Sequence, residues 1–525
     1  MKILLFTVSL ILPMLAGALD VIRFSEASAK PAAPASYVYA VDLRNVKDDK
    51  LKVTLTVSGM YKQELIFCMP RIVPGIYGDM NFGTYLSEIQ AYDFRGKPLE
   101  IVKLDENRWK ILNAIQIGKI TYTVDDGWEE FDTFKEGMYL SASSTFKEKE
   151  VFLINHNALF GYLEGFDRKN IQLQIKKPAH LYGATSLRRI NAFDSIDYYM
   201  ARDYHSLVDN PIMYARPDTT NFRIGDINVT VAVHATGGQQ ISAEIATHIR
   251  PLLQHQKNYL GGKLPVKNYT FLIYHNENPD VNSYMGDGLE HANSTLILMY
   301  MPWDPEVIKE NVYGIASHEF FHTLIPLGLH SEEIEFYNFN HPVFSKHLWL
   351  YEGMTEYFTL HMPVKEKVQS GDEFLRALKR KIDQMEGFSN ERSLTDLSVD
   401  VMDNQKDFYN FYLKGTLVNL CLDIRLRELS GGNYGVTDLI SDMLKVHGPG
   451  KPFQDDKLFE ELAQVSKHKE LLPFFKDYVS GTAPLPLKES LAKAGIEFNP
   501  ADNTVSWSKD PSEAQLLLRK HWIGL

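Results

Sequence analysis

Cysteine is nearly absent from this sequence, which has only Cys68 and Cys421 among its 525 residues. So few thiols exclude a disulfide framework and a cysteine-rich metal site, because both need several clustered cysteines. Cys68 lies in a run that predicts a strand, and Cys421 lies on the apolar face of a predicted helix. We therefore expect two separate buried thiols and a fold that is stabilised by its hydrophobic core.

Basic residues are also in short supply, because acidic residues outnumber them and the formal net charge is −12. Such an acidic chain disfavours nucleic acids and anionic membrane surfaces as partners. Apolar residues make up 44% of the sequence, which is ordinary for a globular protein. The length exceeds what one hydrophobic core supports, so we expect several domains. The sequence does not indicate an oligomeric state.

Long apolar runs are missing except at the very start. Lys2 precedes a mostly apolar stretch from Ile3 to Leu15, and Ala16-Gly17-Ala18 fits an A-x-A cleavage site. This pattern predicts a signal peptide (residues 1–18) cleaved near Ala18, and an exported protein that is periplasmic or secreted and free of the membrane once mature. An uncleaved membrane anchor is the competing interpretation, although the run is short for one. Residues 19–36 are rich in Ala, Ser and Pro and predict a flexible lead-in.

The rest of the chain predicts a multi-domain α+β fold. Within residues 37–220, runs such as Leu51 to Val57 and Ile120 to Val124 alternate apolar and polar side chains and are broken by turn signals, as in a β-sandwich. Strand patterns alternate with helix patterns in residues 221–395, and residues 396–525 are mainly helical.

The strongest chemical signal is HExxH, formed by His318, Glu319 and His322 in a predicted helix over residues 311–325 that ends before Pro326. Residues four apart share one face of a helix, so both imidazoles can bind a single zinc ion while Glu319 lies beside it as a general base. The alternative interpretation is two histidines on a helix surface. A third ligand decides between these interpretations.

Glu352 is the candidate third ligand, in a predicted helix that begins with Ser345 as its N-cap and stops before Pro363. Together with the two histidines, it would complete a Zn²⁺ site with three protein ligands and an open fourth position for water. Glu356 follows one helical turn later and is suited to accept the second ring N–H of a ligating histidine. The alternative for Glu356 is an ordinary solvated charge on a helix.

Four segments occur together in a fixed order: Gly288-Leu289-Glu290-His291, HEFFH at 318–322, Trp349 to Tyr357 with Glu352, and Tyr412-Leu-Lys414-Gly415. In this combination the sequence resembles the glycyl aminopeptidase family of gluzincin zinc metallopeptidases. Weaker similarity in Pro70 to Tyr77 and Asp203 to Pro211 extends the resemblance over roughly residues 35 to 500. The resemblance implies a thermolysin-like zinc catalytic domain over residues 221–395 and one Zn²⁺ per chain.

The resemblance also implies roles outside the metal ligands. Glu290 would bind the α-ammonium of the substrate, within a substrate-binding segment that includes Gly288 and His291 and that we expect to be a loop leading into a strand. Tyr412 would donate a hydrogen bond to the oxyanion of the reaction. From the residues alone, an exposed turn charge is the preferred interpretation of Glu290 and simple packing that of Tyr412, and the neighbouring Tyr409 leaves the tyrosine assignment open.

We therefore expect a zinc metallo-aminopeptidase that acts on peptides with a free N-terminus, with a small or glycine-like preference implied by the family. Thr323-Leu-Ile-Pro-Leu departs from the tryptophan, asparagine and basic residues common in the family, and it adjoins the expected cleft. Family members often carry a C-terminal PDZ module, which we do not expect in the 25 residues after Pro500. Two other functions remain open: a zinc endopeptidase or other zinc hydrolase, and a non-catalytic surface binding protein.

Overall fold

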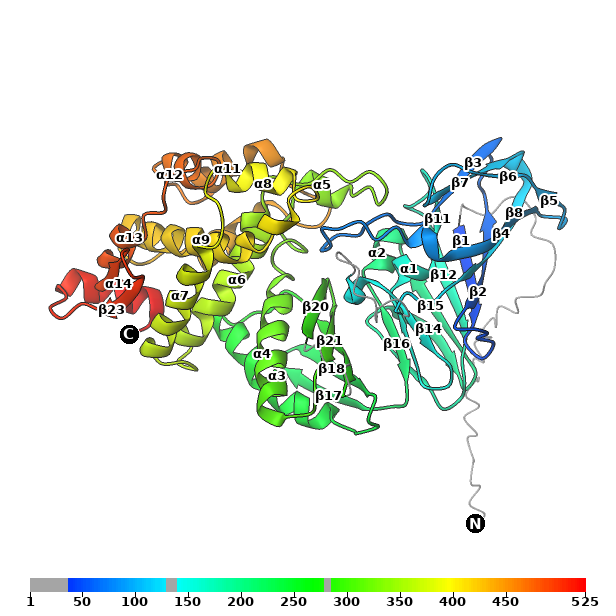
Figure 1. Ribbon diagram of the computed structural model, residues 1–525, viewed down its shortest axis with the longest axis horizontal. Coiled ribbons are helices and arrows are strands. Elements are labelled where there is room, and N and C mark those ends of the chain that lie inside the picture. The colour runs from blue at the N-terminus through cyan, green and yellow to red at the C-terminus, as the bar shows by residue number, and fades with distance from the viewer. Residues whose placement is uncertain (1–35, 129–138, 278–284) are drawn as a thin grey trace, which may run out of the picture.

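The computed structural model describes residues 36–128, 139–277 and 285–525. The predicted signal peptide, its cleavage site at Ala18 and nearly all of the predicted lead-in lie outside these residues. Figure 1 shows three parts in a row, with a sheet-rich part (blue to cyan), a central α+β part (green) and helices (yellow to red). The helices of the described residues include none with the length and apolar character needed to cross a bilayer. The multi-domain α+β fold class is confirmed, while the boundaries near residues 220 and 395 stay predictions.

The N-terminal part is a sandwich of two sheets, formed by strands whose alternating apolar side chains face one core. Within the described residues its larger sheet has the order β14-β15-β12-β1-β2-β8-β4-β5, and its smaller sheet has the order β11-β3-β7-β6. Buried residues of both sheets, such as Leu55 and Phe67, belong to one hydrophobic cluster. The larger sheet comprises β14 (Arg188–Phe193), β15 (Ile196–Ala201), β12 (Asn170–Lys176), β1 (Ser36–Asp42), β2 (Leu51–Ser58), β8 (Ile117–Val124), β4 (Leu86–Asp93) and β5 (Pro98–Leu99), and the smaller β11 (Tyr162–Leu163), β3 (Glu64–Cys68), β7 (Arg108–Leu112) and β6 (Ile101–Lys103).

The central part is built on a sheet with the order β17-β18-β19-β21-β20, in which β20 is an edge strand antiparallel to β21. One face packs on helices α3 (Ser242–Tyr259) and α4 (Pro305–Phe321). The other face packs on a further sheet, β13-β16-β10-β9, through residues such as Leu153 and Leu298. The strands are β17 (Thr219–Ile224), β18 (Ile227–Ala235), β19 (Asn268–Asn276), β21 (Ser294–Tyr300) and β20 (Met285–His291), with β13 (Tyr182–Ala184), β16 (Ile212–Ala215), β10 (Val151–Ile154) and β9 (Thr145–Lys147) in the covering sheet.

Helices form most of the remainder and share one hydrophobic core with the central part, from Phe222 to Ile523. Cys421 is buried in α9 and Cys68 is buried at the end of β3, and both are free thiols, as predicted. Two short helices, α1 (His156–Leu159) and α2 (Tyr204–Val208), pack instead in the core of the N-terminal part. The helices of the remainder are α5 (Glu332–Glu335), α6 (Leu348–Lys365), α7 (Gly371–Met385), α8 (Leu394–Val399), α9 (Asn410–Leu429), α10 (Val436–Val446), α11 (Leu458–Val465), α12 (Leu471–Tyr478), α13 (Leu487–Lys493) and α14 (Glu513–Ile523), with a hairpin of β22 (Ile496–Asn499) and β23 (Thr504–Trp507) before α14.

Two helix predictions were wrong at their ends. The HExxH helix was expected over residues 311–325, but α4 spans Pro305–Phe321. It starts earlier because Asp304 caps it and Pro305 suits its first position. It ends earlier because the amide groups of Thr323 and Leu324 bond three residues back, in a tight turn before the proline.

The Glu352 helix was expected to start after Ser345 and to stop before Pro363, but α6 spans Leu348–Lys365. Ser345 does not cap it, because its hydroxyl contacts Tyr351 and Asp455 instead. Pro363 removes one backbone hydrogen bond near the end of the helix only, where the buried side chains of Met362 and Val364 hold the last turn in place.

Candidate metal centre

The two histidines of HExxH lie side by side at the C-terminal end of α4. His318 is in the last turn and His322 caps the helix. Their ring centroids are 4.7 Å apart and their Nε2 atoms are 3.1 Å apart. This spacing follows from the four-residue interval on one helical face, so both Nε2 atoms point to one location.

Helix α6 brings Glu352 to the same location. Glu352 Oε2 lies 3.5 Å from Nε2 of His318 and 3.5 Å from Nε2 of His322. A tetrahedral zinc site with ligands at about 2.0–2.1 Å has donor-to-donor edges of roughly 3.3–3.4 Å. The three donor atoms therefore have the separations of one face of such a site, and together they form a candidate metal-binding group.

The chemistry of this group also fits a cation. Glu352 Oε2 is buried and has no hydrogen-bond partner among the described residues, although it faces two imidazole nitrogens. Burial alone would lower the pKa of His318, but its contacts with Glu352 and Glu356 raise that pKa well above its usual value. The site therefore favours positive charge at the point where the donors meet.

Both histidines are oriented through their Nδ1 atoms. His318 Nδ1 lies 2.8 Å from Glu356 Oε2, and His322 Nδ1 lies 2.9 Å from the carbonyl oxygen of Ile325. An Nδ1–H that donates to an acceptor leaves the Nε2 lone pair free for a metal. Burial opposes ionisation of Glu356, but Lys381, at 2.6 Å, and His318 lower its pKa to about 2. The structure thus gives Glu356 the contact that the sequence suggested.

Glu319 and Glu352 are both buried in this centre, yet their pKa values move in opposite directions. Burial raises the pKa of Glu319 well above its usual value. The nearby His318 lowers this pKa, and the carboxylates of Glu290 and Glu352 raise it further. Burial also opposes ionisation of Glu352, but His322 and His318 outweigh it and lower the pKa of that carboxyl. Divergent pKa values suit a proton-accepting group beside a permanent anionic ligand.

Glu290 approaches the centre from the edge strand β20. The segment around Glu290 was expected to be a loop, but Met285–His291 is a strand because it pairs with β21 along its whole length. One carboxylate oxygen of Glu290 lies within 4.8 Å of donor atoms of Glu319 and His322. Gly288 permits this approach of strand and helix, since a Cβ there would lie 2.7 Å from Glu319 Oε1.

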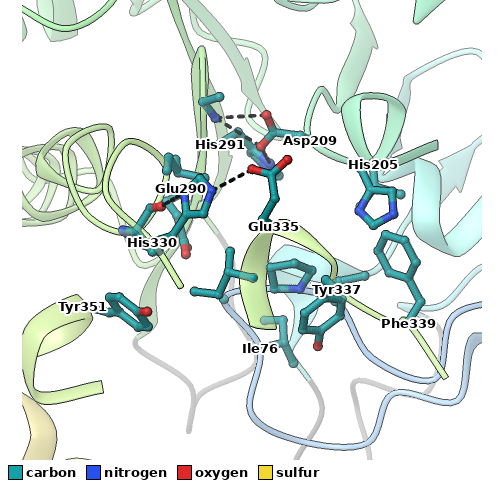
Figure 2. A pocket seen from close by; sticks show the side chains of 18 of the residues that line it. Ile76, His205, Asp209, Glu290, His291, His330, Glu335, Tyr337, Phe339 and Tyr351 are labelled. Carbon is teal, nitrogen blue, oxygen red and sulfur yellow. Dashed lines mark hydrogen bonds and ion pairs between the residues drawn. The ribbon is translucent and has the colours of Figure 1, made fainter. Parts of the chain in front are cut away.

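The structure does not bring His291 to the metal donors. His291 is the last residue of β20 and is not among the donor atoms that meet at the candidate site. Its Nδ1 lies 3.5 Å from Asp209 Oδ1, on the wall of a neighbouring cavity (Figure 2). Any contact between His291 and a substrate would therefore take place in that cavity.

Tyr412, near the start of α9, lies directly against the metal centre. Its ring stacks on His318 with 5.5 Å between centroids. Burial raises the pKa of Tyr412 well above its usual value, and the negative charge of the nearby Glu352 carboxylate adds to this shift. Tyr409 lies one layer further out, stacked on Tyr412 at 5.6 Å and 53% exposed. Of the two phenols, only Tyr412 adjoins the donors.

Tyr77 is a further member of the site to which the sequence gave no role. Its buried hydroxyl donates a 3.0 Å hydrogen bond to Glu352 Oε1, across 275 positions of sequence. The same loop brings Gly75 against Glu290, with a Cβ position only 2.8 Å from Glu290 Oε2. The one available signal was the weak resemblance in Pro70 to Tyr77, which did not show what the loop contacts.

Solved structures share this fold at low sequence identity. An aminopeptidase N family protein from Idiomarina loihiensis matches with a TM-score of 0.75 and 21% identity, over 91% of this chain and 82% of that one. An M1 zinc metallopeptidase from Deinococcus radiodurans has a TM-score of 0.54 and 12% identity, over 86% and 94% of the two chains. Yeast LTA4 hydrolase has a TM-score of 0.50 and 13% identity, over 87% and 70%. No curated protein sequence matches the chain.

Two family models match the sequence itself. The peptidase M61 N-terminal domain matches residues 38–216, which include the loop with Gly75 and Tyr77. The M61 glycyl aminopeptidase model matches residues 311–418, which contain the three candidate metal ligands, Glu319 and Tyr412. The matches lie in the expected order and together cover more than half of the sequence, so this chain belongs to the M61 glycyl aminopeptidase family.

Proposed function

We propose that this protein is a zinc-dependent aminopeptidase that removes N-terminal residues from peptides. The observation that carries the proposal is the convergence of three groups within a few ångströms. The donors of His318, His322 and Glu352 form a metal-binding triangle, and carboxylate oxygens of Glu319 and Glu290 lie within 4.8 Å of a donor nitrogen of His322. A metal-binding group, a general base and an anion for an ammonium are the parts that this reaction needs.

The contact between Gly75 and Glu290 favours attack at the amino end of a peptide. Among the described strands β20 lies at the edge of its sheet, and its outer side would offer backbone groups to an extended peptide, as other sheet edges do. Close packing of Gly75 on the Glu290 carboxylate closes this edge, so a peptide lying along it would end at Glu290. The carboxylate would then bind the terminal ammonium and hold the first peptide bond near the metal-binding triangle.

Each side chain then has a defined task. His318, His322 and Glu352 would hold a zinc ion, which would supply a Lewis acid to activate water and polarise a carbonyl. Glu319 takes the proton of the attacking water and returns it to the leaving amine, for which its raised pKa is suited. The Tyr412 phenol donates a hydrogen bond to the oxyanion as it forms.

Substitution of Glu319 tests this proposal. The variant Glu319→Gln should bind zinc in the same 1:1 ratio as the wild-type protein but hydrolyse a free-amino tripeptide about 10²–10⁴-fold more slowly. Glu306→Gln, an exposed position in the first turn of the same helix, is the matched control and should retain full activity. Removal of zinc with a chelator should abolish turnover, and added zinc should restore it.

Peptides with an acetylated N-terminus distinguish an aminopeptidase from an endopeptidase or another zinc hydrolase. An aminopeptidase should not cleave the N-acetylated form of the same tripeptide, because an acetylated amine cannot pair with Glu290. Hydrolysis of the acetylated peptide alone would establish an endopeptidase or another hydrolase of this fold. Absence of both zinc and turnover would leave a surface binding protein.

We also propose that the protein is exported and acts in the periplasm or outside the cell. The apolar run from Ile3 to Leu15 and the A-x-A sequence ending at Ala18 support this proposal. N-terminal sequencing of the protein from its native host should begin at Leu19, and a chain that retains Met1 in a membrane fraction would point to the uncleaved anchor.

A further inference from the structure

A cavity of about 280 Å³ adjoins Glu290 at the junction of the sandwich and the central part (Figure 2). Its walls come from the loop before Tyr77, the end of β20, the turn after the HExxH helix and the segment that leads into α6. The apolar residues that line it include Val73, Ile76, Leu289, Leu327, Phe344 and Leu348. No residue of the metal-binding triangle lines this cavity.

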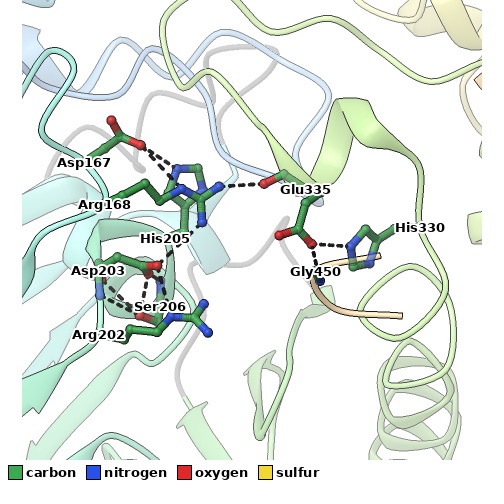
Figure 3. Close-up of polar contacts among 9 residues, drawn as sticks. All are labelled: Asp167, Arg168, Arg202, Asp203, His205, Ser206, His330, Glu335 and Gly450. Atoms are coloured by element: carbon green, nitrogen blue, oxygen red, sulfur yellow. Dashed lines mark hydrogen bonds and ion pairs between the residues drawn. The ribbon is translucent and has the colours of Figure 1, made fainter. Parts of the chain in front are cut away.

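The histidines on the walls each lie near a carboxylate. His330 Nε2 lies 2.9 Å from Glu335, His205 lies 3.3 Å from Asp167, and His291 lies 3.5 Å from Asp209. Figure 3 shows the first two of these pairs on opposite sides of the junction.

The two arginines of the wall are paired in the same way. Arg168 lies 3.5 Å from Asp203, and Arg202 lies 3.1 Å from that same carboxylate (Figure 3). Arg168 also donates a 2.6 Å hydrogen bond to the carbonyl oxygen of Glu335. The basic side chains of the wall thus have acidic neighbours, and away from Glu290 the cavity favours an uncharged apolar side chain over a charged one.

Two polar atoms on the walls have no hydrogen-bond partner among the described residues. They are His291 Nε2 and Tyr337 Oη, and both side chains are more than nine-tenths buried. Buried polar groups are almost always hydrogen-bonded, so these two indicate capacity for one polar group of an occupant or a water. The hydroxyl of a substrate tyrosine could form a hydrogen bond with one of these two atoms, whereas a charged side chain would need more hydrogen-bond partners than they provide.

The cavity adjoins Glu290, the group proposed to bind the substrate's terminal amine. Glu290 forms part of its wall, and one oxygen of that carboxylate lies within 4.8 Å of donor atoms of Glu319 and His322. In an N-terminal residue, the amine and the side chain branch from the same carbon. When the amine pairs with Glu290 and the carbonyl faces the triangle, the remaining substituent reaches the cavity.

We propose that this cavity binds the side chain of the substrate's N-terminal residue and selects large apolar side chains, such as leucine, methionine, phenylalanine and tyrosine, over glycine. This inference rests on the proposed aminopeptidase function and assigns its substrate class. Filling an apolar cavity releases water from both surfaces, and glycine gains nothing from it.

Two N-terminal residues on one peptide test the proposal. Leu-Ala-Ala and Gly-Ala-Ala differ only in the first side chain, and we expect kcat/KM for the leucyl peptide to be about 50-fold higher or more, since even one methylene is worth about tenfold or more in an apolar site. Calorimetric titration of zinc-loaded Glu319→Gln should show the same order of affinity without turnover.

Val343→Trp tests the cavity itself. Val343 lines the cavity and is 68% exposed, so an indole there can cover the opening without disturbing the core. We expect kcat/KM for the leucyl peptide to fall about tenfold, and that for the glycyl peptide to change less than about twofold. Val399→Trp makes the same change at an exposed position outside the cavity and should alter neither.

The outcomes separate this inference from the proposed function. An active enzyme that prefers the glycyl peptide, or whose preference is the same in Val343→Trp, overturns the inference and leaves the aminopeptidase function standing. A zinc-loaded protein that cleaves neither peptide refutes the aminopeptidase function. Equal binding of both peptides by Glu319→Gln overturns the inference without reference to catalysis.

Discussion

At the scale of single residues, we expect different effects from substituting the two stacked tyrosines beside the metal centre, Tyr412 and Tyr409. Tyr412 contacts His318 and Glu352, whereas Tyr409 is half-exposed and contacts Tyr412. We expect Tyr412→Phe to lower kcat about 10²-fold with little change in KM, because the lost donor acts on the oxyanion. Tyr409→Phe is the matched control and should keep kcat within about twofold. Steady-state kinetics with the leucyl peptide will measure both, and the reverse order would assign the role to Tyr409.

We expect loss of the Tyr77 hydroxyl to weaken zinc binding. It donates to Glu352 Oε1 inside the protein, so Tyr77→Phe leaves that oxygen without its partner and loosens the ligand. Partners of metal ligands typically contribute about 10–100-fold in affinity, and we expect a loss of that size. Zinc competition with a chelator of known affinity measures it.

A second tyrosine makes the control for this measurement. Tyr351 is the residue before Glu352 on α6, and its hydroxyl contacts Ser345 and the Ser331 amide instead of the metal donors. Tyr351→Phe should therefore leave zinc affinity unchanged. If Tyr77→Phe also binds zinc like the wild-type protein, the Glu352 carboxylate is held by its helix alone.

How far the sequence predicts these residues depends on their separation along the chain. The roles of His318, Glu319 and His322 could be predicted from the sequence, because one helix fixes their relative positions within five residues. Glu352 and Glu356 could be identified in the same way, because they lie one turn apart on a second helix. The role of Tyr77 could not be predicted from the sequence. Its contact with Glu352 depends on how the sandwich packs against α6, and no local sequence pattern determines that packing.

At the scale of elements, composition and periodicity predicted which segments are helices and strands more reliably than where they end. The segment around Glu290 was assigned to a loop because its two glycines are typical of turns. It is a strand because β21 pairs with it and α4 packs so closely that larger residues would not fit at Gly288. Pro363 likewise did not end α6, because buried neighbours outweigh the loss of one hydrogen bond.

The crossing of α6 and α9 gives a prediction at this scale. Gly353 and Gly415 let the two helices meet backbone to backbone, and a Cβ at Gly415 would lie 2.9 Å from the Gly353 Cα. We expect Gly415→Ala to push the helices apart, to destabilise the protein by about 1–3 kcal/mol and to lower kcat by displacing Tyr412 from Glu352. Thermal unfolding and kinetics on the same preparation measure both effects.

Gly314→Ala is the control for this substitution, because Gly314 is also inside a helix but a Cβ there meets no atom within 4 Å. Alanine is the better helix former by about 0.8–1.0 kcal/mol, so this variant should be as stable as the wild-type protein or more stable. Equal behaviour of the two variants would show that the α6–α9 contact tolerates an added methyl group.

At the scale of the whole molecule, Glu335 joins the three parts of the protein. Its carboxylate accepts hydrogen bonds from His330 and from the backbone amide of Gly450, and its carbonyl accepts one from Arg168 of the sandwich (Figure 3). Burial opposes ionisation of Glu335, but the Gly450 amide and His330 outweigh it and hold the pKa below its ordinary value of 4.5.

A carboxyl group whose pKa is lower in the folded state than in the unfolded state stabilises the folded protein at any pH above its unfolded-state pKa. This stabilisation is lost as the pH falls through the folded-state pKa. Glu335→Gln should therefore melt about 1–3 °C below the wild-type protein at pH 7, a small shift because the group is partly exposed. The difference should be smaller at pH 3 than at pH 7, because the contribution of the carboxylate is lost as the pH falls through its lowered folded pKa. Thermal melts at both values measure the change.

Glu332→Gln, in the same short helix but exposed, is the matched control and should follow the wild-type protein at both pH values. A constant difference between Glu335→Gln and the wild-type protein at pH 7 and pH 3 would mean that shape, not charge, matters at this position. Identical melting at both pH values would mean that Arg168, which contacts only the backbone of Glu335, joins the sandwich to the central part without help from the carboxylate.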